Sequence, residues 1–288
     1  MLHVVEWLVL LFVVIAGGFN VVTFAIAFGR GPRPRGLWTA LGKEMLATLV
    51  LIPAWPLFAF IGATYRARTR STGDGDHSRT HIVLLHGYMM NRTNWLWLGP
   101  HLARRGLGPL HGLSYFTLQP IADSARRLAA YVEALAKREG IERVDLVGHS
   151  MGGLVARYYI EKLGGAARVR RLITIATPHH GTRLGRLAIG AARREIVPGS
   201  PHCAPFTGAP EGVDYTSIWS RADNLVVPPE SAQLTPMPPE EGEAQFYDSG
   251  DDSCGSVFDD VVFDDLGHLG LLVSPRVAEA ICSRLQAA

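Results

Sequence analysis

The chain has 288 residues and a mass of 31.3 kDa, which suffices for one sizeable hydrophobic core or for one domain with an appended segment. Its formal net charge of +2 shows no excess of basic residues, which argues against a nucleic-acid-binding protein. The mean hydropathy of +0.14 is high for a soluble protein, and the excess lies near the N-terminus.

Two N-terminal segments, residues 7–29 and 45–65, contain no Asp, Glu, Lys or Arg. About 20 apolar helical residues cross the roughly 30 Å hydrocarbon core of a bilayer, so these segments predict two transmembrane helices. The hairpin would occupy residues 1–70 and make a multi-pass membrane protein. Basic residues lie both in the loop between the two segments and after the second segment, so the sequence does not assign the side of the membrane on which the C-terminal domain lies. For the first segment the alternative is a cleaved signal peptide, but its leader has no Lys or Arg and carries Glu6. A buried pair of hydrophobic helices is the alternative for both segments.

A polar linker at residues 71–79 leads into residues 80–288, where strand-like and helix-like segments alternate. This alternation predicts an α/β domain with a mostly parallel sheet of about six strands and helices on both faces. The expected strands are 80–87, 112–116, 143–150, 169–178, 214–223 and 256–265, and the expected helices are 94–105, 121–139, 151–163 and 273–286. Long loops are expected between 178 and 242, and residues 183–213 are a candidate lid.

The segment "VDLVGHSMGGLVARYY" places Ser150 between an apolar strand and a helical pattern. Ligands bind beyond the carboxyl ends of strands in open α/β sheets, so this serine is expected at a binding edge. Gly148 and Gly152 flank it because the tight turn leaves no room for a Cβ. The helix that follows points its first N–H groups at charge that develops there. The pattern therefore predicts a nucleophilic serine.

A serine hydroxyl needs a base, most often a histidine held by an acid. His268 is the expected base because it lies after the last predicted strand, at the same sheet edge as Ser150. Asp223 ends another strand and is the favoured acid, which gives the chain order Ser, Asp, His. His149 is expected to point away from the reacting side. The competing acids are Asp259, Asp260, Asp264 and Asp265, and the last two lie close to His268 along the chain.

Acyl transfer also needs two hydrogen-bond donors for the oxyanion. The N–H of Met151 follows the serine directly, and the N–H of Tyr88 lies in the loop after the strand at 80–87. Met89 and Trp95 near that loop are expected to bind substrate, with packing of the first helix as the alternative for Trp95. His179 is expected to form part of the wall of the site.

With these residues in view, the chain resembles bacterial lipases and esterases of the α/β-hydrolase superfamily. The matching segments are "VLLHGY", "DLVGHSMGGLVARYY", "LITIATPHHGT", "SRADNLVVP" and "LGHLGLL", in family order. The resemblance implies a triad of Ser150, Asp223 and His268, with Tyr88 and Met151 as oxyanion donors. Some relatives carry a structural calcium ion, but the acidic stretch at 248–252 lacks a recognisable ligand spacing, so no metal or cofactor is expected.

We therefore expect a serine hydrolase that cleaves carboxylic esters, with a lipid or another hydrophobic ester as substrate and the membrane bilayer as partner. An acyltransferase with the same triad and a non-catalytic membrane scaffold remain alternatives, and a two-helix membrane carrier is a weaker one because the spans lack ionisable residues. Three cysteines do not make a disulfide framework. Cys203 and Cys254 lie in loop-like sequence, where a disulfide and free thiols are both open.

Overall fold

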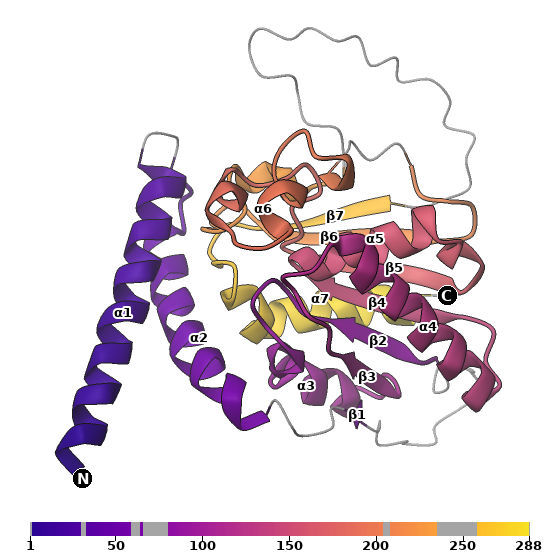
Figure 1. Ribbon diagram of the computed structural model, residues 1–288, viewed down its shortest axis with the longest axis horizontal. Coiled ribbons are helices and arrows are strands. Elements are labelled where there is room, and N and C mark those ends of the chain that lie inside the picture. Colours follow the sequence, from indigo (N-terminus) through magenta and orange to yellow (C-terminus); the bar gives the residue numbers. More distant parts are fainter. Residues whose placement is uncertain are drawn as a thin grey trace, which may run out of the picture.

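The computed structural model describes residues 2–29, 33–58, 64–65, 80–203, 208–234 and 258–287. Seven strands form one sheet in the order β1-β3-β2-β4-β5-β6-β7 (Figure 1). The strands are β1 (Thr64–Tyr65), β2 (Ile82–Leu85), β3 (Leu110–Leu113), β4 (Val144–His149), β5 (Val169–Ile175), β6 (Asp214–Ser220) and β7 (Phe258–Phe263). All pairings are parallel except that of β1 with β3, so the predicted parallel sheet is confirmed.

Helices cover both faces of this sheet (Figure 1). The α-helices are α1 (Leu2–Phe28), α2 (Leu37–Phe58), α3 (Leu98–Arg104), α4 (Ile121–Glu139), α5 (Met151–Lys162), α6 (Ala192–Glu195) and α7 (Pro275–Gln286). Short 3₁₀ helices are η2 (Arg92–Trp95), η3 (Gly165–Ala167), η4 (Arg183–Leu187), η5 (Pro201–Cys203), η6 (Pro229–Ala232) and η7 (Gly270–Val273).

Strand alternation divides the core into two layers. In β2, Val83 and Leu85 pack in one cluster with side chains of α4 and α5. Ile82 and Leu84 point to the other face, where they pack with side chains of α3 and α7. Because the parallel strands all end at one edge, the loops after β2, β4, β6 and β7 gather there.

Most predicted elements of residues 80–288 match observed ones, but the predicted helix at 94–105 is divided into η2 and α3, and one strand is shifted. α4 has the predicted bounds, but β3 ends at Leu113, before the predicted strand end at residue 116. Tyr115 lies beyond the strand because its N–H donates to His86 Nε2 at 3.2 Å and its hydroxyl donates to the His86 carbonyl. This aromatic residue therefore fixes the loop after β2 instead of extending the sheet.

The prediction of a second transmembrane helix at residues 45–65 is wrong. α2 begins at Leu37, well before the predicted start, and Thr64–Tyr65 form strand β1, so the sheet takes a strand from the predicted hairpin segment. Ala47 and Leu51 are each 1% exposed and belong to the core cluster of the α3–α7 face. α2 therefore packs on the α/β domain with one face, which explains why an apolar sequence is found there.

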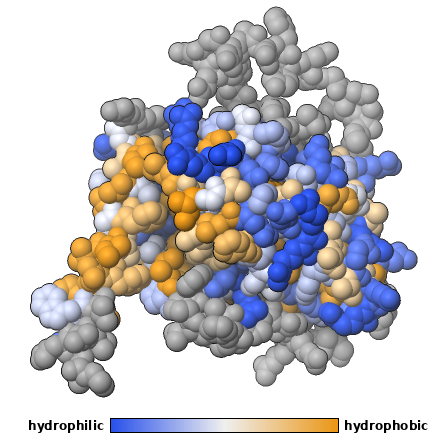
Figure 2. Space-filling view, in the orientation of Figure 1, coloured by the Kyte–Doolittle hydropathy of each residue, from blue (hydrophilic) through white to orange (hydrophobic). Residues whose placement is uncertain are grey.

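Helix α1 has a different environment. Within the described residues, Val9–Phe28 is the one segment that is long and apolar enough to cross a membrane, and as an N-terminal helix it fits an anchor or a signal sequence. Much of its surface is exposed and apolar, which Figure 2 shows as an orange flank of the molecule. Its exposed apolar residues include Trp7, Val9, Leu10, Leu11, Val14, Ile15, Phe19, Val21, Val22 and Ile26.

Several predicted features lie wholly or partly outside the described residues. These are the linker at 71–79, Cys254, and the acidic stretch at 248–252. Cys203 is a buried thiol that donates to the carbonyl of Glu195 at 3.3 Å. The candidate lid contains η4, α6 and η5, with residues 204–207 undescribed.

Candidate active site

Ser150 occupies the turn between β4 and α5, with φ 55° and ψ −127°. A residue with a Cβ is strained at positive φ, and such strain persists only where the surroundings hold it. Here the Ser150 N–H donates to the Ile175 carbonyl at 2.8 Å, and the Ser150 carbonyl accepts from the Gly153 N–H at 3.0 Å. The turn thus presents the serine at the carboxyl edge of the sheet, immediately before α5.

The two glycines of the motif are required by close backbone approaches. A Cβ on Gly148 would lie 2.7 Å from the Gly153 nitrogen, and a Cβ on Gly152 would lie 2.5 Å from the Leu85 carbonyl oxygen. Both distances are shorter than real Cβ contacts. Glycine therefore lets α5 pack directly against the end of β2 and brings the loop after β2 next to Ser150.

Asp223 and His268 come together from the loops after β6 and β7. His268 Nδ1 lies 2.9 Å and 3.1 Å from the two carboxylate oxygens of Asp223, and the side chains are 5% and 1% exposed respectively. Asp223 Oδ1 also accepts the N–H groups of Leu225 and Val226 at 2.8 Å and 2.9 Å. The carboxylate is thus fixed by its own loop and orients the imidazole.

The electrostatics of the pair suit a base. Burial lowers the pKa of His268, but the charge and hydrogen bond of Asp223, with a smaller effect of the Glu44 charge, leave this pKa above its ordinary value. An Nδ1–H that donates to Asp223 leaves Nε2 as the acceptor nitrogen in the neutral ring. The ring can therefore take up a proton at Nε2.

The competing aspartates are engaged elsewhere. Asp264 pairs with Arg221 at 2.8 Å, Asp265 pairs with Lys43 at 2.6 Å and with Arg276, and Asp259 pairs with Arg284. Asp260 accepts a backbone N–H at 3.1 Å. Asp223 is therefore the acid that the structure brings to His268.

His149 is buried and lies beside His268, a contact that the sequence did not predict. Its ring centroid is 4.7 Å from that of His268, its Nδ1 accepts from Asn94 Nδ2 at 3.0 Å, and its Nε2–H donates to the His268 carbonyl at 3.3 Å. Burial and the neighbouring His268 hold the pKa of His149 well below its ordinary value, which favours the neutral form of the ring. His149 thus links the serine turn to the His268 loop.

The loop after β2 approaches the serine at Gly87. A Cβ on Gly87 would lie 3.0 Å from the Cβ of Ser150. Tyr88 follows Gly87 and Met151 follows Ser150, so the two predicted oxyanion donors belong to the two segments that meet at this contact. Within the part of the chain that the structure describes, neither amide donates to a protein oxygen. His86 holds the loop, with Nδ1–H donating to the Gly87 carbonyl at 3.0 Å.

The predicted substrate-binding residues differ in exposure. Met89 is 52% exposed, and its N–H donates to Thr117 Oγ1 at 3.1 Å. Trp95 is fully buried in the core, so the structure supports packing of η2 and not substrate contact. His179 is also fully buried, with Nε2 2.9 Å from Thr174 Oγ1 and Nδ1 3.2 Å from an Arg157 nitrogen. Neither Trp95 nor His179 thus presents exposed side-chain surface in this structure.

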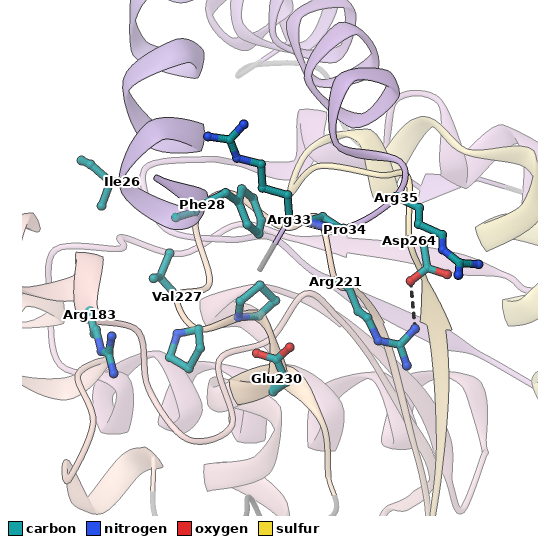
Figure 3. Close-up of a pocket in the computed structure, with 13 residues that line it drawn as sticks. Ile26, Phe28, Arg33, Pro34, Arg35, Arg183, Arg221, Val227, Glu230 and Asp264 are labelled. Carbon is teal, nitrogen blue, oxygen red and sulfur yellow. Dashed lines mark hydrogen bonds and ion pairs between the residues drawn. The ribbon is translucent and has the colours of Figure 1, made fainter. Parts of the chain in front are cut away.

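A cavity of about 830 Å³ opens where the end of α1 meets the loop after β6 (Figure 3). Phe28 and Val227 line it, and Arg221 pairs with Asp264 beside it at 2.8 Å. Ser150 and His268 do not line this cavity. It is therefore distinct from the surface on which the serine would react, although it adjoins the loop that carries Asp223.

Comparisons with known proteins agree with this architecture. A family model described as alpha/beta hydrolase fold matches residues 80–193. The mature form of the Bacillus licheniformis lipase BlEst2 superposes with a TM-score of 0.56 at 15% identity, covering 77% of this chain and 97% of that one. Aspergillus fumigatus lipase B gives a TM-score of 0.57 at 16% identity, covering 90% and 63% of the two chains. The product of the Listeria innocua gene lin2722 gives 0.52 at 17% identity, covering 73% and 95%. The chain thus has the α/β-hydrolase fold.

Three residues beside the site escaped the sequence analysis. Asn94 holds His149, Asn224 accepts the His268 N–H at 3.2 Å, and Glu44 accepts the N–H groups that follow His268. Asn224 had a local signal, because it follows Asp223 directly. The signal for Glu44 was its place as the one carboxylate of α2, immediately before the uncharged segment 45–65.

Proposed function

We propose that this protein is a serine hydrolase that cleaves carboxylic esters through an acyl-enzyme on Ser150. The observation that carries the proposal is the buried Asp223–His268 pair, 2.9 Å apart, beside a strained serine turn. His149, the residue before Ser150, has its ring 4.7 Å from that of His268, so the histidine loop packs against the strand end that carries Ser150. The fold and its lipase neighbours support the same chemistry.

The proposed reaction proceeds in two halves. His268 Nε2 takes the proton of the Ser150 hydroxyl while Oγ attacks the ester carbonyl, and the oxyanion is held by the N–H groups of Met151 and Tyr88. The bond to the alcohol then breaks, and His268 gives its proton to the departing oxygen. A water molecule repeats the sequence on the acyl-enzyme and releases the acid. Asp223 keeps the imidazole in the required tautomer and stabilises its charged form.

We propose lipids or other hydrophobic esters as substrates. The support is α1, whose exposed apolar side chains in the Val9–Phe28 segment favour burial in a lipid surface. An enzyme attached in this way meets esters at an interface, where acyl chains are concentrated. In this proposal α1 is the membrane anchor, and α2 belongs to the catalytic unit.

The test compares wild type with Ser150→Ala on esters of increasing acyl length, presented both in solution and in micelles. Wild type should hydrolyse them and prefer micellar long-chain esters. Ser150→Ala should lose about 10⁴- to 10⁶-fold in kcat with an unchanged circular dichroism spectrum. Undiminished hydrolysis by the variant overturns the nucleophile assignment. A wild type that cleaves only short soluble esters overturns the lipid preference.

A further inference from the structure

A buried carboxylate from the N-terminal hairpin contacts the histidine loop, residues 266–270. Glu44 in α2 is 1% exposed, and its Oε1 accepts the N–H of Leu269 at 3.0 Å while its Oε2 accepts the N–H of Gly270 at 2.7 Å. These are the two residues that follow His268, although 225 positions separate Glu44 from Leu269. Buried backbone donors need a partner, and here one side chain supplies both acceptors.

The histidine loop is shaped to receive this carboxylate. A Cβ on Gly267, the residue before His268, would lie 2.5 Å from Glu44 Oε2. The neighbouring residue of α2, Lys43, pairs with Asp265 at 2.6 Å just before the loop. α2 therefore holds the loop both at its start and after the histidine.

A second contact comes from helix α1 through Asn224. Asn224 Oδ1 accepts the His268 N–H at 3.2 Å, and its Nδ2 donates to Thr23 Oγ1 of α1 at 2.8 Å. The two helices are joined by Asn20 Nδ2, which donates to Thr48 Oγ1 at 3.0 Å. Both helices of the hairpin are thus hydrogen-bonded to the backbone around His268, α2 directly through Glu44 and α1 through Asn224.

We propose that Glu44 is a positioning residue for His268, so that the N-terminal hairpin forms part of the hydrolytic machinery instead of serving only as a tether. This inference rests on the proposed function, because it assigns a role relative to the base of that reaction. Fixing the two amides after His268 sets the direction of the loop and hence of the imidazole. Loss of one of the two Glu44 acceptors lets the His268 ring move away from the position from which it can take the Ser150 proton.

The charge of Glu44 gives a signature that a packing role lacks. Burial raises the pKa of Glu44 to about 7, opposed by its hydrogen bonds to Leu269 and Gly270. On the helices packed against α2, the charged groups are Glu6 in α1 and Arg92 in η2. Around the histidine loop they are Asp265, His268 and Asp223. His268 and Asp223 act on Glu44, and the Glu44 charge in turn raises the pKa of His268. Removing this charge should therefore lower the pKa of His268.

The test uses Glu44→Gln and Glu44→Asp in the full-length protein. Glu44→Gln keeps the size but loses the charge and one acceptor, whereas Glu44→Asp keeps the charge but shortens the reach. Glu279→Gln is the matched control, because Glu279 is an exposed residue of α7 that pairs with Arg105 and not with the histidine loop. Each variant is assayed for kcat and KM on a short soluble ester, for the pH profile of kcat/KM, and for thermal unfolding.

We expect both Glu44 variants to lose roughly 10- to 100-fold in kcat, with little change in KM. The acid limb of the profile should move to lower pH in Glu44→Gln, stay in place in Glu44→Asp, and be unchanged in Glu279→Gln. A wild-type kcat in both variants, or an acid limb that does not move in Glu44→Gln, overturns the proposal. If a variant folds poorly, the rate of phosphonate labelling per folded molecule replaces kcat. A wild type without hydrolysis or labelling refutes the proposed function instead, before any Glu44 variant is compared.

Discussion

Replacing Gly152 with alanine tests whether the contact of α5 with the end of β2 sets the oxyanion geometry. The new Cβ would lie 2.5 Å from the Leu85 carbonyl oxygen and 2.7 Å from that of His86, whereas ordinary contact begins at 3.4 Å. Either α5 or the loop that carries Tyr88 must therefore move by roughly 1 Å, which costs on the order of 100-fold in rate. Overpacking of this kind also costs about 1–3 kcal/mol of stability.

The assay is kcat/KM on a soluble ester, alongside urea unfolding to confirm that the variant is folded at the assay temperature. Gly18→Ala in α1 is the control, because no atom beyond its chain neighbours and its own helix backbone lies within 4 Å of the added Cβ. The control should keep wild-type kcat/KM. Folded Gly152→Ala with kcat/KM within about threefold of wild type would refute the idea that this contact positions the oxyanion donors.

Three further predictions address the acid, the hairpin and the anchor. Asp223→Asn should lower kcat by about 10⁴-fold. It should also lower the pKa of His268, so the residual activity of the variant should persist to lower pH than that of wild type. An acid limb of the pH–rate profile that does not move contradicts the pairing of Asp223 with His268. Thr23→Val leaves the buried Asn224 amide without its acceptor and should cost about 1–3 kcal/mol in unfolding free energy, while Thr23→Ser should cost much less. Phe19→Asn on the exposed face of α1 should weaken binding to phosphatidylcholine vesicles tenfold or more, since burying such a side chain contributes about 1.5–3 kcal/mol; equal vesicle binding contradicts the anchor.

The parallel sheet and its helices could be predicted from the sequence because they depend on local patterns. The apolar run before Gly148, the periodicity of 121–139 and the glycines around Ser150 each reflect a constraint carried by neighbouring residues. The order of strand ends then placed Asp223 and His268 at one edge, and the structure brings them within hydrogen-bonding distance.

The remaining features depend on contacts between distant segments. Hydropathy could not show that α2 buries Ala47 and Leu51 against the α/β domain, because a buried helix and a membrane helix are equally apolar. Likewise, nothing local marks Trp95 as a core residue and Met89 as an exposed one. The pairing of Glu44 with the histidine loop joins segments more than 200 positions apart, and only the folded chain reveals it.

Labelling with a fluorophosphonate, followed by peptide mass spectrometry, tests most directly whether His268 activates the Ser150 hydroxyl. Folded wild type should gain one adduct on Ser150, Ser150→Ala should gain none, and His268→Ala should react orders of magnitude more slowly than wild type. An adduct at another residue, no adduct on the folded wild type, or labelling of His268→Ala at the wild-type rate would contradict the account.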